Sequence, residues 1–234
     1  MTSALSPELR ERLSNVAVAT LSAQLMKRGY KNITIDGVHP LVPGTKIVGT
    51  ARTLRFVAHR PDLAKQRGGG YNAHKRAIDT LNEGDVLVIE ARGYPYAGTL
   101  GDVLALRAKV CGAAGIVTDG AIRDGAEIAK LGIPVCTPTT HPYPNGRVHI
   151  PWDNDVTITC GGAPVCVGDV VVADDDGALV FPIDLAEELV EACEKQELME
   201  TFVAEMIAQG EPLDGLFPMS EKWNEPFEQW KAER

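Results

Sequence analysis

The sequence of 234 residues predicts a single mixed α/β domain, and three observations support this class. Residues 86–136 alternate apolar strands with helices, which is the pattern of parallel strands joined by crossover helices. Residues 156–181 contain short β-branched runs separated by Gly-rich or Asp-rich turns. A long helix is predicted over 185–208, and no internal repeat or low-complexity linker divides the chain. A chain of this length buries about 70% of its unfolded surface, so its core needs neither disulfides nor a structural metal.

The first predicted element is an amphipathic helix that begins after Ser6 and ends at Gly29. Ser6 can cap this helix, Pro7 suits its first turn, and apolar residues recur at spacings of three and four. β-branched residues then dominate from 46 to 57, which predicts a strand. Gly49 within this run indicates a bulge.

In the middle of the chain, helices alternate with continuous apolar runs that suit buried strands. The predicted helices are 72–82, 102–114 and 122–132, and the predicted strands are 86–89, 115–117 and 133–136. Ligands of such folds bind at the carboxyl ends of the parallel strands. The loops that follow strands 86–89 and 115–117 should therefore meet at one pocket.

The C-terminal half is predicted to form short strands and to end in an aromatic tail. The strands are 156–159, 165–167, 170–173 and 178–181. Asp176-Gly177 is typical of a tight hairpin turn. We take residues 1–209 as the domain and 210–234 as the tail. The tail's large aromatic residues should dock on the same chain or on a neighbouring subunit; they are Phe217, Trp223, Phe227 and Trp230.

The composition argues against several classes of partner and location. The chain has 23 Lys and Arg against 32 Asp and Glu, so its net charge of −9 disfavours binding to nucleic acid or anionic membranes. Its apolar runs are far shorter than the ~20 residues that cross a bilayer, and its start lacks a signal-peptide pattern, so we expect a cytoplasmic protein. The five cysteines form no C-x-x-C pair, which fits buried thiols in a reducing compartment.

The candidate functional residues lie in two loops that each enter a predicted helix. The first loop consists of Gly98, Thr99, Leu100, Gly101 and Asp102. Its backbone N–H groups could bind an anion or a developing oxyanion. In the second loop, Arg123 can form two hydrogen bonds with a carboxylate, and Asp124 can bind a divalent cation. Taken alone, an Asp at the start of a helix is more often a cap, and an Arg-Asp pair is more often a surface ion pair. The presence of Asp102 and Glu127 as well favours one shared site.

These residues resemble the RraA-like family, and specifically its metal-dependent 4-hydroxy-4-methyl-2-oxoglutarate / 4-carboxy-4-hydroxy-2-oxoadipate aldolases. Asp102 is followed after twenty residues by Arg123-Asp124, and after two more by Glu127, which is the spacing of the aldolase members. The sequence Asp-Gly-Ala-Ile-Arg-Asp at 119–124 is also similar to that family. The resemblance covers roughly residues 10 to 205.

The resemblance implies an α-β-β-α sandwich with mixed sheets and a long C-terminal helix. It further implies a homotrimer or homohexamer with active sites between the subunits. The implied activity is that of a class II, metal-dependent pyruvate aldolase. Such an enzyme cleaves a 4-hydroxy-2-oxo acid, for example 4-hydroxy-4-methyl-2-oxoglutarate, to pyruvate and a second oxo acid. Decarboxylation of oxaloacetate would be a side activity, because it produces the same enolate.

The resemblance also implies roles for individual residues. Asp124 would hold the cation, with Asp102 and Glu127 reaching its water ligands. The cation would be Mg²⁺, with Mn²⁺ or Co²⁺ as alternatives. Arg123 would bind the oxo acid, and the loop of residues 98–102 would donate backbone hydrogen bonds to it. Glu197 is the candidate for an acid that a neighbouring subunit contributes.

Two alternative functions stay open. One is a non-catalytic, ribonuclease-binding regulator, although the relatives of that kind lack the complete acidic set found here. The other is a decarboxylase or hydro-lyase that acts on a sugar-derived acid, with a pocket shaped by the loops of Tyr94, Tyr96 and His141. Asn72 and His74 follow a Gly-rich loop. They either line the pocket or have the ordinary roles of capping a helix and packing in the core.

Overall fold

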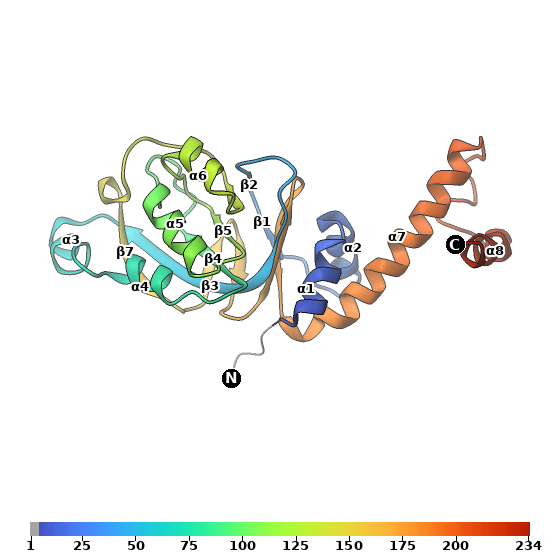
Figure 1. Ribbon diagram of the computed structural model, residues 1–234, viewed down its shortest axis with the longest axis horizontal. Helices are drawn as coiled ribbons and strands as arrows, with labels where there is room; N and C mark the ends of the chain where they lie inside the picture. Colours follow the sequence, from blue (N-terminus) through green and yellow to red (C-terminus); the bar gives the residue numbers. More distant parts are fainter. Residues whose placement is uncertain (1–4) are drawn as a thin grey trace.

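The computed structural model describes residues 5–234, within which nine strands form one mixed sheet and two more form a separate hairpin (Figure 1). The strands of the sheet are β1 (Thr34–Ile35), β2 (His39–Pro40), β3 (Ile47–Ala58), β4 (Asp85–Glu90), β5 (Gly115–Thr118), β6 (Val135–Thr137), β7 (His149–Asn154), β10 (Val170–Asp174) and β11 (Gly177–Phe181). The hairpin consists of β8 (Ile158–Cys160) and β9 (Ala163–Val165). The sheet has the order β1-β11-β10-β3-β4-β5-β6-β2, and β7 pairs with β3.

Strands β3 to β6 are parallel to one another, as the alternation in residues 86–136 predicts. Residues 86–89 of β4 are all fully buried. Val86 and Val88 pack toward the β8–β9 hairpin, whereas Leu87 and Ile89 pack toward helices. Successive side chains of a strand point to opposite faces, so β4 is covered on both sides. The mixed α/β class is therefore confirmed, and the carboxyl ends of β4 and β5 lie at the same edge of the sheet.

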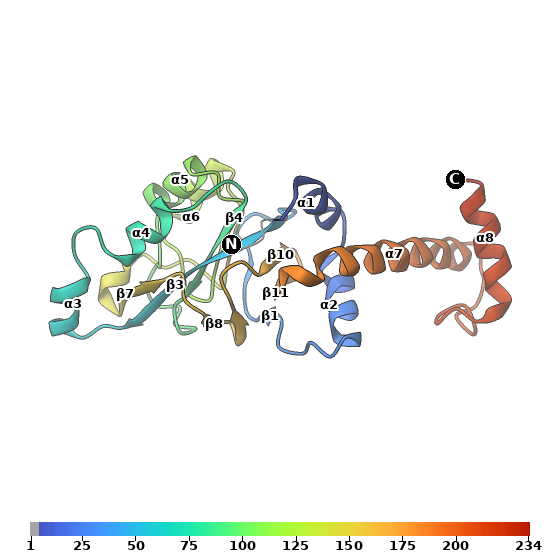
Figure 2. The same ribbon diagram turned by 90° about the horizontal axis from the view of Figure 1, so that it is seen from below.

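Two groups of helices pack on the sheet, whereas α8 lies in an arm away from it (Figures 1 and 2). The helices are α1 (Pro7–Ser14), α2 (Val18–Lys27), α3 (Pro61–Arg67), α4 (Ala73–Asp79), α5 (Asp102–Val110), α6 (Gly125–Leu131), α7 (Ala186–Ala208) and α8 (Asn224–Ala232), with 3₁₀ turns η1 (Asn145–Arg147), η2 (Ile183–Leu185) and η3 (Glu221–Trp223). Helices α4, α5 and α6 pack on the part of the sheet around β4 and β5. Helices α1, α2 and α7 pack on β10 and β11. The long C-terminal helix is thus present as α7.

The single helix predicted over 6–29 is wrong, because the structure contains two helices, α1 and α2. Carboxylates from distant parts of the chain bind the start of α2. Glu197 Oε1 accepts a hydrogen bond from the Ala17 N–H at 2.8 Å, and Asp174 Oδ2 accepts one from the Val18 N–H at 2.9 Å. These carboxylates satisfy N–H groups that the helix itself leaves unpaired. Apolar periodicity does not reveal such long-range caps.

The sequence did not predict β1, β2, β7, α3 or α8, whereas the other predicted strands and helices are present with shifted ends. The four C-terminal strands lie within two residues of their predicted positions, and residues 174–177 form the predicted hairpin turn. Strand β3 is irregular between Arg55 and Phe56, so the bulge predicted at Gly49 is wrong. Gly49 is required instead by a close approach, because a Cβ there would lie 2.3 Å from the carbonyl oxygen of Gly84.

The C-terminal segment leaves the body of the molecule as an arm (Figures 1 and 2). The first turns of α7 pack against α1 and α2, and its distal half extends beyond them together with α8. Phe202 and Leu216 are buried in a small core of the arm, and Trp223, Phe227 and Trp230 pack around them. Trp223, Phe227 and Trp230 of the tail therefore contact the same chain, whereas Phe217 is 54% exposed. Within residues 5–234, no helix combines the length and apolar character that a bilayer span requires.

Candidate functional site

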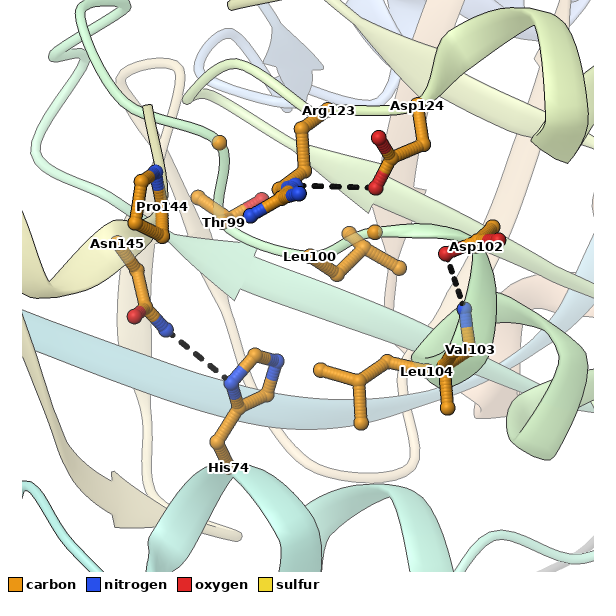
Figure 3. A pocket seen from close by; sticks show the side chains of 12 residues that line it. His74, Thr99, Leu100, Asp102, Val103, Leu104, Arg123, Asp124, Pro144 and Asn145 are labelled. Carbon is orange, nitrogen blue, oxygen red and sulfur yellow. Dashed lines mark hydrogen bonds and ion pairs between the residues drawn. The ribbon is translucent and has the colours of Figure 1, made fainter. Parts of the chain in front are cut away.

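A pocket of about 290 Å³ lies between the loops that follow β4 and β5 (Figure 3). All five residues of the predicted loop 98–102 line it, as do Arg123 and Asp124. His74, Pro144 and Asn145 contribute to another wall. The two loops selected from the sequence therefore meet, because parallel strands place their carboxyl ends at one edge of the sheet.

Backbone hydrogen bonds join the two loops into one unit. Thr99 donates its N–H to the Ala121 carbonyl at 2.6 Å, and Arg123 donates its N–H to the Leu100 carbonyl at 2.9 Å. Gly98 forms a parallel β-bridge with Ala121. A Cβ on Gly98 would lie 2.8 Å from the backbone nitrogen of Arg123, so only glycine permits this approach.

The same hydrogen bonds decide which loop amides are available to a ligand. The N–H groups of Gly98 and Thr99 donate to protein carbonyls and are committed. Within the described part of the chain, the N–H groups of Leu100, Gly101 and Asp102 have no such acceptor. These three lie at the N-terminus of α5, where the helix dipole favours negative charge. The amides of this loop that could donate to an anion are thus those of residues 100–102.

Asp124 directs its carboxylate toward the pocket. Its backbone is left-handed, with φ of +58°, and its side chain accepts no hydrogen bond from the N–H groups of α6. Oδ2 instead accepts a hydrogen bond from Nε of Arg123 at 3.0 Å. The structure therefore argues against a helix cap at Asp124, and the carboxylate is placed to bind a ligand or cation.

The five acidic and basic candidates do not all reach this pocket. Asp102 lines it, and its Oδ1 accepts a hydrogen bond from the Val103 N–H at 2.8 Å. Glu127 does not line it; this side chain is exposed on α6 and forms an ion pair with Lys130 at 2.7 Å. Glu197 lies on α7, where it caps α2 of the same chain. Within one chain, the pocket thus combines Asp102, Arg123 and Asp124.

The pocket supplies two carboxylates that could contact a cation. Among residues 5–234, no three His, Cys, Asp or Glu side chains are grouped so that they could enclose a cation. Asp102 and Asp124 supply two carboxylates to the same pocket. Mg²⁺ usually keeps several water ligands and binds proteins through one or two carboxylates plus substrate oxygens. The donor set therefore fits Mg²⁺ better than a cation that requires a complete protein cage.

Sequence reasoning left His74 undecided and missed Asn145. His74 is 4% exposed, and its Nδ1 lies 3.3 Å from Nδ2 of Asn145. Burial lowers the pKa of His74 to about 4, and the charge of Lys75 acts in the same direction. Asn145 begins the short 3₁₀ turn η1 and belongs to no recognisable motif, so no sequence signal was available for it. The other undecided residue, Asn72, caps α4 by accepting a hydrogen bond from the Lys75 N–H.

Asp119 has a supporting role that the sequence did not indicate. Its buried carboxylate accepts hydrogen bonds from the N–H groups of Ala91 at 2.5 Å, Gly93 at 2.9 Å and Gly161 at 3.4 Å. Burial raises the pKa of Asp119, although these hydrogen bonds oppose the shift. The carboxylate thereby fixes the start of the loop that leads from β4 to the pocket.

The loops proposed for a sugar-derived substrate lie elsewhere. Tyr94, Tyr96 and His141 do not line the pocket. Tyr94 and Tyr96 pack edge to face with ring centroids 5.1 Å apart, and His141 stacks on Tyr143. The structure therefore offers no support from these residues for the alternative substrate.

Comparisons with known proteins agree with this architecture. Residues 18–180 match a family model described as RraA-like, Aldolase/RraA. A protein of Halalkalibacterium halodurans named "putative 4-hydroxy-4-methyl-2-oxoglutarate aldolase" is 32% identical over 174 residues, which cover 72% of this chain and 75% of the relative.

Two solved structures have closely similar folds. RraAS2 of Streptomyces coelicolor, described as an unusual member of the RNase ES inhibitor RraA protein family, is 37% identical with a TM-score of 0.77; the match covers 84% of this chain and 96% of that one. An uncharacterized protein of Pseudomonas syringae has a TM-score of 0.78 at 23% identity, covering 92% and 98% of the two chains. At that identity, the second comparison supports the fold alone.

Proposed function

Because the chain belongs to the RraA-like family, we propose that it is a divalent-metal-dependent lyase that cleaves a 4-hydroxy-2-oxo acid to pyruvate and a second oxo acid. The observation that carries this proposal is the convergence of Asp102, Arg123 and Asp124 with the available amides of residues 100–102 in one pocket. The name of the Halalkalibacterium relative makes 4-hydroxy-4-methyl-2-oxoglutarate the first substrate to test. Oxaloacetate is the second, because its decarboxylation yields the same pyruvate enolate.

Asp124 and Asp102 are the residues that would hold the cation, Asp124 directly and Asp102 through water. We assign Mg²⁺ first, with Mn²⁺ and Co²⁺ as alternatives. When bound, the cation would supply Lewis-acid polarisation of the substrate carbonyl. The lack of a side-chain cap at the start of α6 supports this assignment, because the Asp124 carboxylate is not committed to the helix.

Arg123 is suited to bind the carboxylate of the oxo acid. Its Nε is paired with Asp124, whereas its terminal nitrogens have no carboxylate partner among residues 5–234. In Figure 3 the guanidinium extends over the pocket, on the side of Thr99. A guanidinium can donate two parallel hydrogen bonds to a carboxylate, which fixes its orientation as well as its position.

The difficult part of the reaction is the enolate of pyruvate that forms when the carbon–carbon bond breaks. The N–H groups of Leu100, Gly101 and Asp102 lie at the N-terminus of α5 and can donate to the oxygen on which this charge develops. Donors that are already oriented stabilise the charge without further reorganisation. Arg123 adds positive charge on the same side of the pocket.

The C4 hydroxyl of the substrate must lose a proton as the bond breaks. Asp102 is the pocket carboxylate without an ion-pair partner in the described chain, so we assign it the acceptor role, directly or through a water. The family resemblance also suggests Glu127 and an acid from a neighbouring subunit, such as Glu197. Glu127 faces Lys130 instead of the pocket, which makes Asp102 the better candidate within one chain.

A homo-oligomer, trimeric or hexameric, forms part of this proposal. Val103, Leu106 and Val110 lie on one face of α5 and are 72%, 46% and 67% exposed. Residues at spacings of three and seven share a helix face, so these side chains form a continuous apolar stripe. Val103 also lines the pocket, so a subunit that covers the stripe would reach its rim.

A regulatory role in binding a ribonuclease is the second candidate, because RraAS2 is described as an unusual member of an RNase inhibitor family. The two functions make different predictions. A lyase releases pyruvate in a metal-dependent reaction, whereas a regulator forms a complex with a ribonuclease and needs no turnover. The pocket residues favour the lyase, since inhibition by surface contact does not require two carboxylates and a guanidinium in one cavity.

The deciding experiment measures pyruvate release from 4-hydroxy-4-methyl-2-oxoglutarate and from oxaloacetate, with Mg²⁺ and with a chelator. We expect release with Mg²⁺ only, and its loss in Asp124→Ala. The matched control is Asp214→Ala, which removes an exposed carboxylate far along the chain in the tail. Wild-type rates in Asp124→Ala would contradict the site assignment. No release from either acid by a folded wild-type protein would contradict the proposed reaction.

A further inference from the structure

The proposed function leaves one wall of the pocket without a role. His74, from α4, and Asn145, from η1, lie across the pocket from Arg123 in the view of Figure 3. Arg123 and the amides of residues 100–102 provide the positive charge for a carboxylate and an enolate oxygen. A substrate whose carboxylate is bound by Arg123 would therefore extend its other half toward His74.

Asn145 determines which nitrogen of His74 carries the proton. The amide nitrogen Nδ2 of Asn145 lies 3.3 Å from Nδ1 of the ring. An amide nitrogen can donate a hydrogen bond but cannot accept one, so Nδ1 is the acceptor. Because burial keeps the ring neutral, with its pKa at about 4, its single proton is on Nε2.

The resulting Nε2–H group has no acceptor. It is buried and without a hydrogen-bond partner among residues 5–234. Buried donors in native proteins are nearly always paired, so an unpaired one beside a cavity needs an explanation. In Figure 3 the Nε2 side of the ring faces Leu104, another residue of the pocket wall. For a ligand oxygen to accept a hydrogen bond from this donor, the Leu104 side chain would have to adopt another rotamer.

We propose that His74 binds the departing half of the substrate, donating a hydrogen bond from Nε2 to an oxygen on that half while Asn145 holds its tautomer. This inference rests on the proposed lyase function. A neutral N–H can donate to a hydroxyl or a carboxylate oxygen, and 4-hydroxy-4-methyl-2-oxoglutarate carries both beyond C3; cleavage turns that hydroxyl into the carbonyl of the second product. His74 is therefore a binding residue for the second product and has no part in forming the enolate of pyruvate.

The test compares two reactions that share the pyruvate half. One is deuterium exchange into the methyl group of pyruvate, followed by NMR in D₂O with Mg²⁺, which requires enolate formation alone. The other is cleavage of 4-hydroxy-4-methyl-2-oxoglutarate, which also requires the departing half. His74→Phe should lower kcat/KM for cleavage by about tenfold or more, since it removes a buried donor, and leave exchange within about twofold of the wild type. His74→Gln keeps an N–H donor and should recover part of the loss.

His149 provides a matched control. It is also buried, its Nε2 also lacks a partner among the described residues, and it packs on Phe56 as His74 does, at 5.6 Å against 5.3 Å between centroids. However, His149 does not line the pocket. His149→Phe should therefore change neither reaction, and thermal melting of all variants reports any common loss of stability.

Three outcomes would overturn the inference. Cleavage by His74→Phe at the wild-type kcat/KM would show that the departing half does not use this donor. An equal loss of exchange and cleavage would place His74 on the pyruvate half. An equal loss of cleavage in His149→Phe would indicate a structural effect. A wild-type protein that performs neither reaction would instead contradict the proposed lyase function, and with it this role of His74.

Discussion

The carboxylate of Asp124 is hydrogen-bonded to the side chain of Arg123, and not to the helix that Asp124 precedes. The Nε to Oδ2 distance is 3.0 Å, and the left-handed backbone at Asp124 makes this orientation feasible. An Asp at the start of a helix usually caps it. The absence of that cap at α6 is the strongest structural argument that Arg123 and Asp124 serve a ligand.

The first prediction concerns the two parallel hydrogen bonds that the guanidinium of Arg123 can donate. Arg123→Lys should lower kcat/KM by about 100-fold, because an ammonium cannot make two parallel hydrogen bonds to a carboxylate. The affinity for Mn²⁺, measured by titration, should change little, since the Asp124 carboxylate remains. Steady-state kinetics and the titration are both needed. A variant that lost metal binding as well would mean that Arg123 acts by holding Asp124 in position.

The second prediction concerns the close contact between Gly101 and Asp124. A Cβ on Gly101 would lie 2.6 Å from Oδ2 of Asp124, so Gly101→Ala must displace the carboxylate. We expect activity to fall by about tenfold or more, because small displacements of catalytic groups are costly. Gly69→Ala is the control, since a Cβ there meets no atom within 4 Å. Equal activity of the two variants would argue against a role for Asp124 at its observed position.

The third prediction is a loss of stability in acid. Burial lowers the pKa of both His74 and His149 to about 4, from 6.5 in the unfolded chain. Between pH 4 and 6.5 the unfolded state therefore binds more protons than the folded state. The contribution of the neutral histidines to the unfolding free energy is complete above pH 6.5 and declines as the pH falls toward 4. Each histidine should account for about 3 kcal/mol of the unfolding free energy that is lost in acid.

Urea unfolding at pH 7, 5.5 and 4.5 measures this effect. His149→Gln should reduce the pH dependence of the unfolding free energy over this interval, because one of the two shifted groups is gone. The charge of Arg92 contributes to the shift at His149, after burial, so Arg92→Gln should reduce it slightly. A pH dependence identical to that of the wild type in His149→Gln would show that this histidine titrates normally.

The fourth prediction concerns Asp119. Asp119→Ala removes the acceptor of three backbone N–H groups and should lower the unfolding free energy by about 3 kcal/mol. It should also reduce activity, because the loop from β4 to Gly98 loses its anchor. Chemical unfolding and pyruvate release measure the two effects. Full stability in the variant would mean that water replaces the carboxylate without cost.

The fifth prediction concerns the apolar stripe on α5. Val110→Glu places a charge on this face and should reduce the mass in light scattering to that of a single chain, 25.1 kDa. Val42→Glu changes an exposed valine outside the stripe and should leave the mass unchanged. A wild-type protein that is already monomeric would contradict the proposed assembly.

Much of the pocket could be predicted because its members follow adjacent parallel strands. Loops 98–102 and 119–124 come after β4 and β5, and strand topology alone brings them together. The spacing of Asp102, Arg123 and Asp124 selected three side chains that do line the pocket. The fold class followed from the same alternation of strands and helices.

Glu127 shows the limit of spacing arguments. A residue three positions after Asp124 would share its helix face if both were helical. Asp124 lies outside α6 in a left-handed conformation, so the two side chains diverge and Glu127 pairs with Lys130. His74 and Asn145 show a second limit, since 71 residues separate them and only tertiary packing brings them into contact. The break between α1 and α2 similarly depends on carboxylates from α7 and β10.

The β-bridges between the loops that line the pocket make these loops as ordered as the strands of the sheet. Gly98 pairs with Ala121, and Ile122 pairs with Thr140, so the parallel order continues beyond the ends of the strands. Amides such as those of Thr99 and Arg123 should then exchange with solvent as slowly as the core strands do, unlike those of ordinary loops. A ligand that arrives at such loops meets donors that are already ordered, and loses little affinity to the entropy of fixing them.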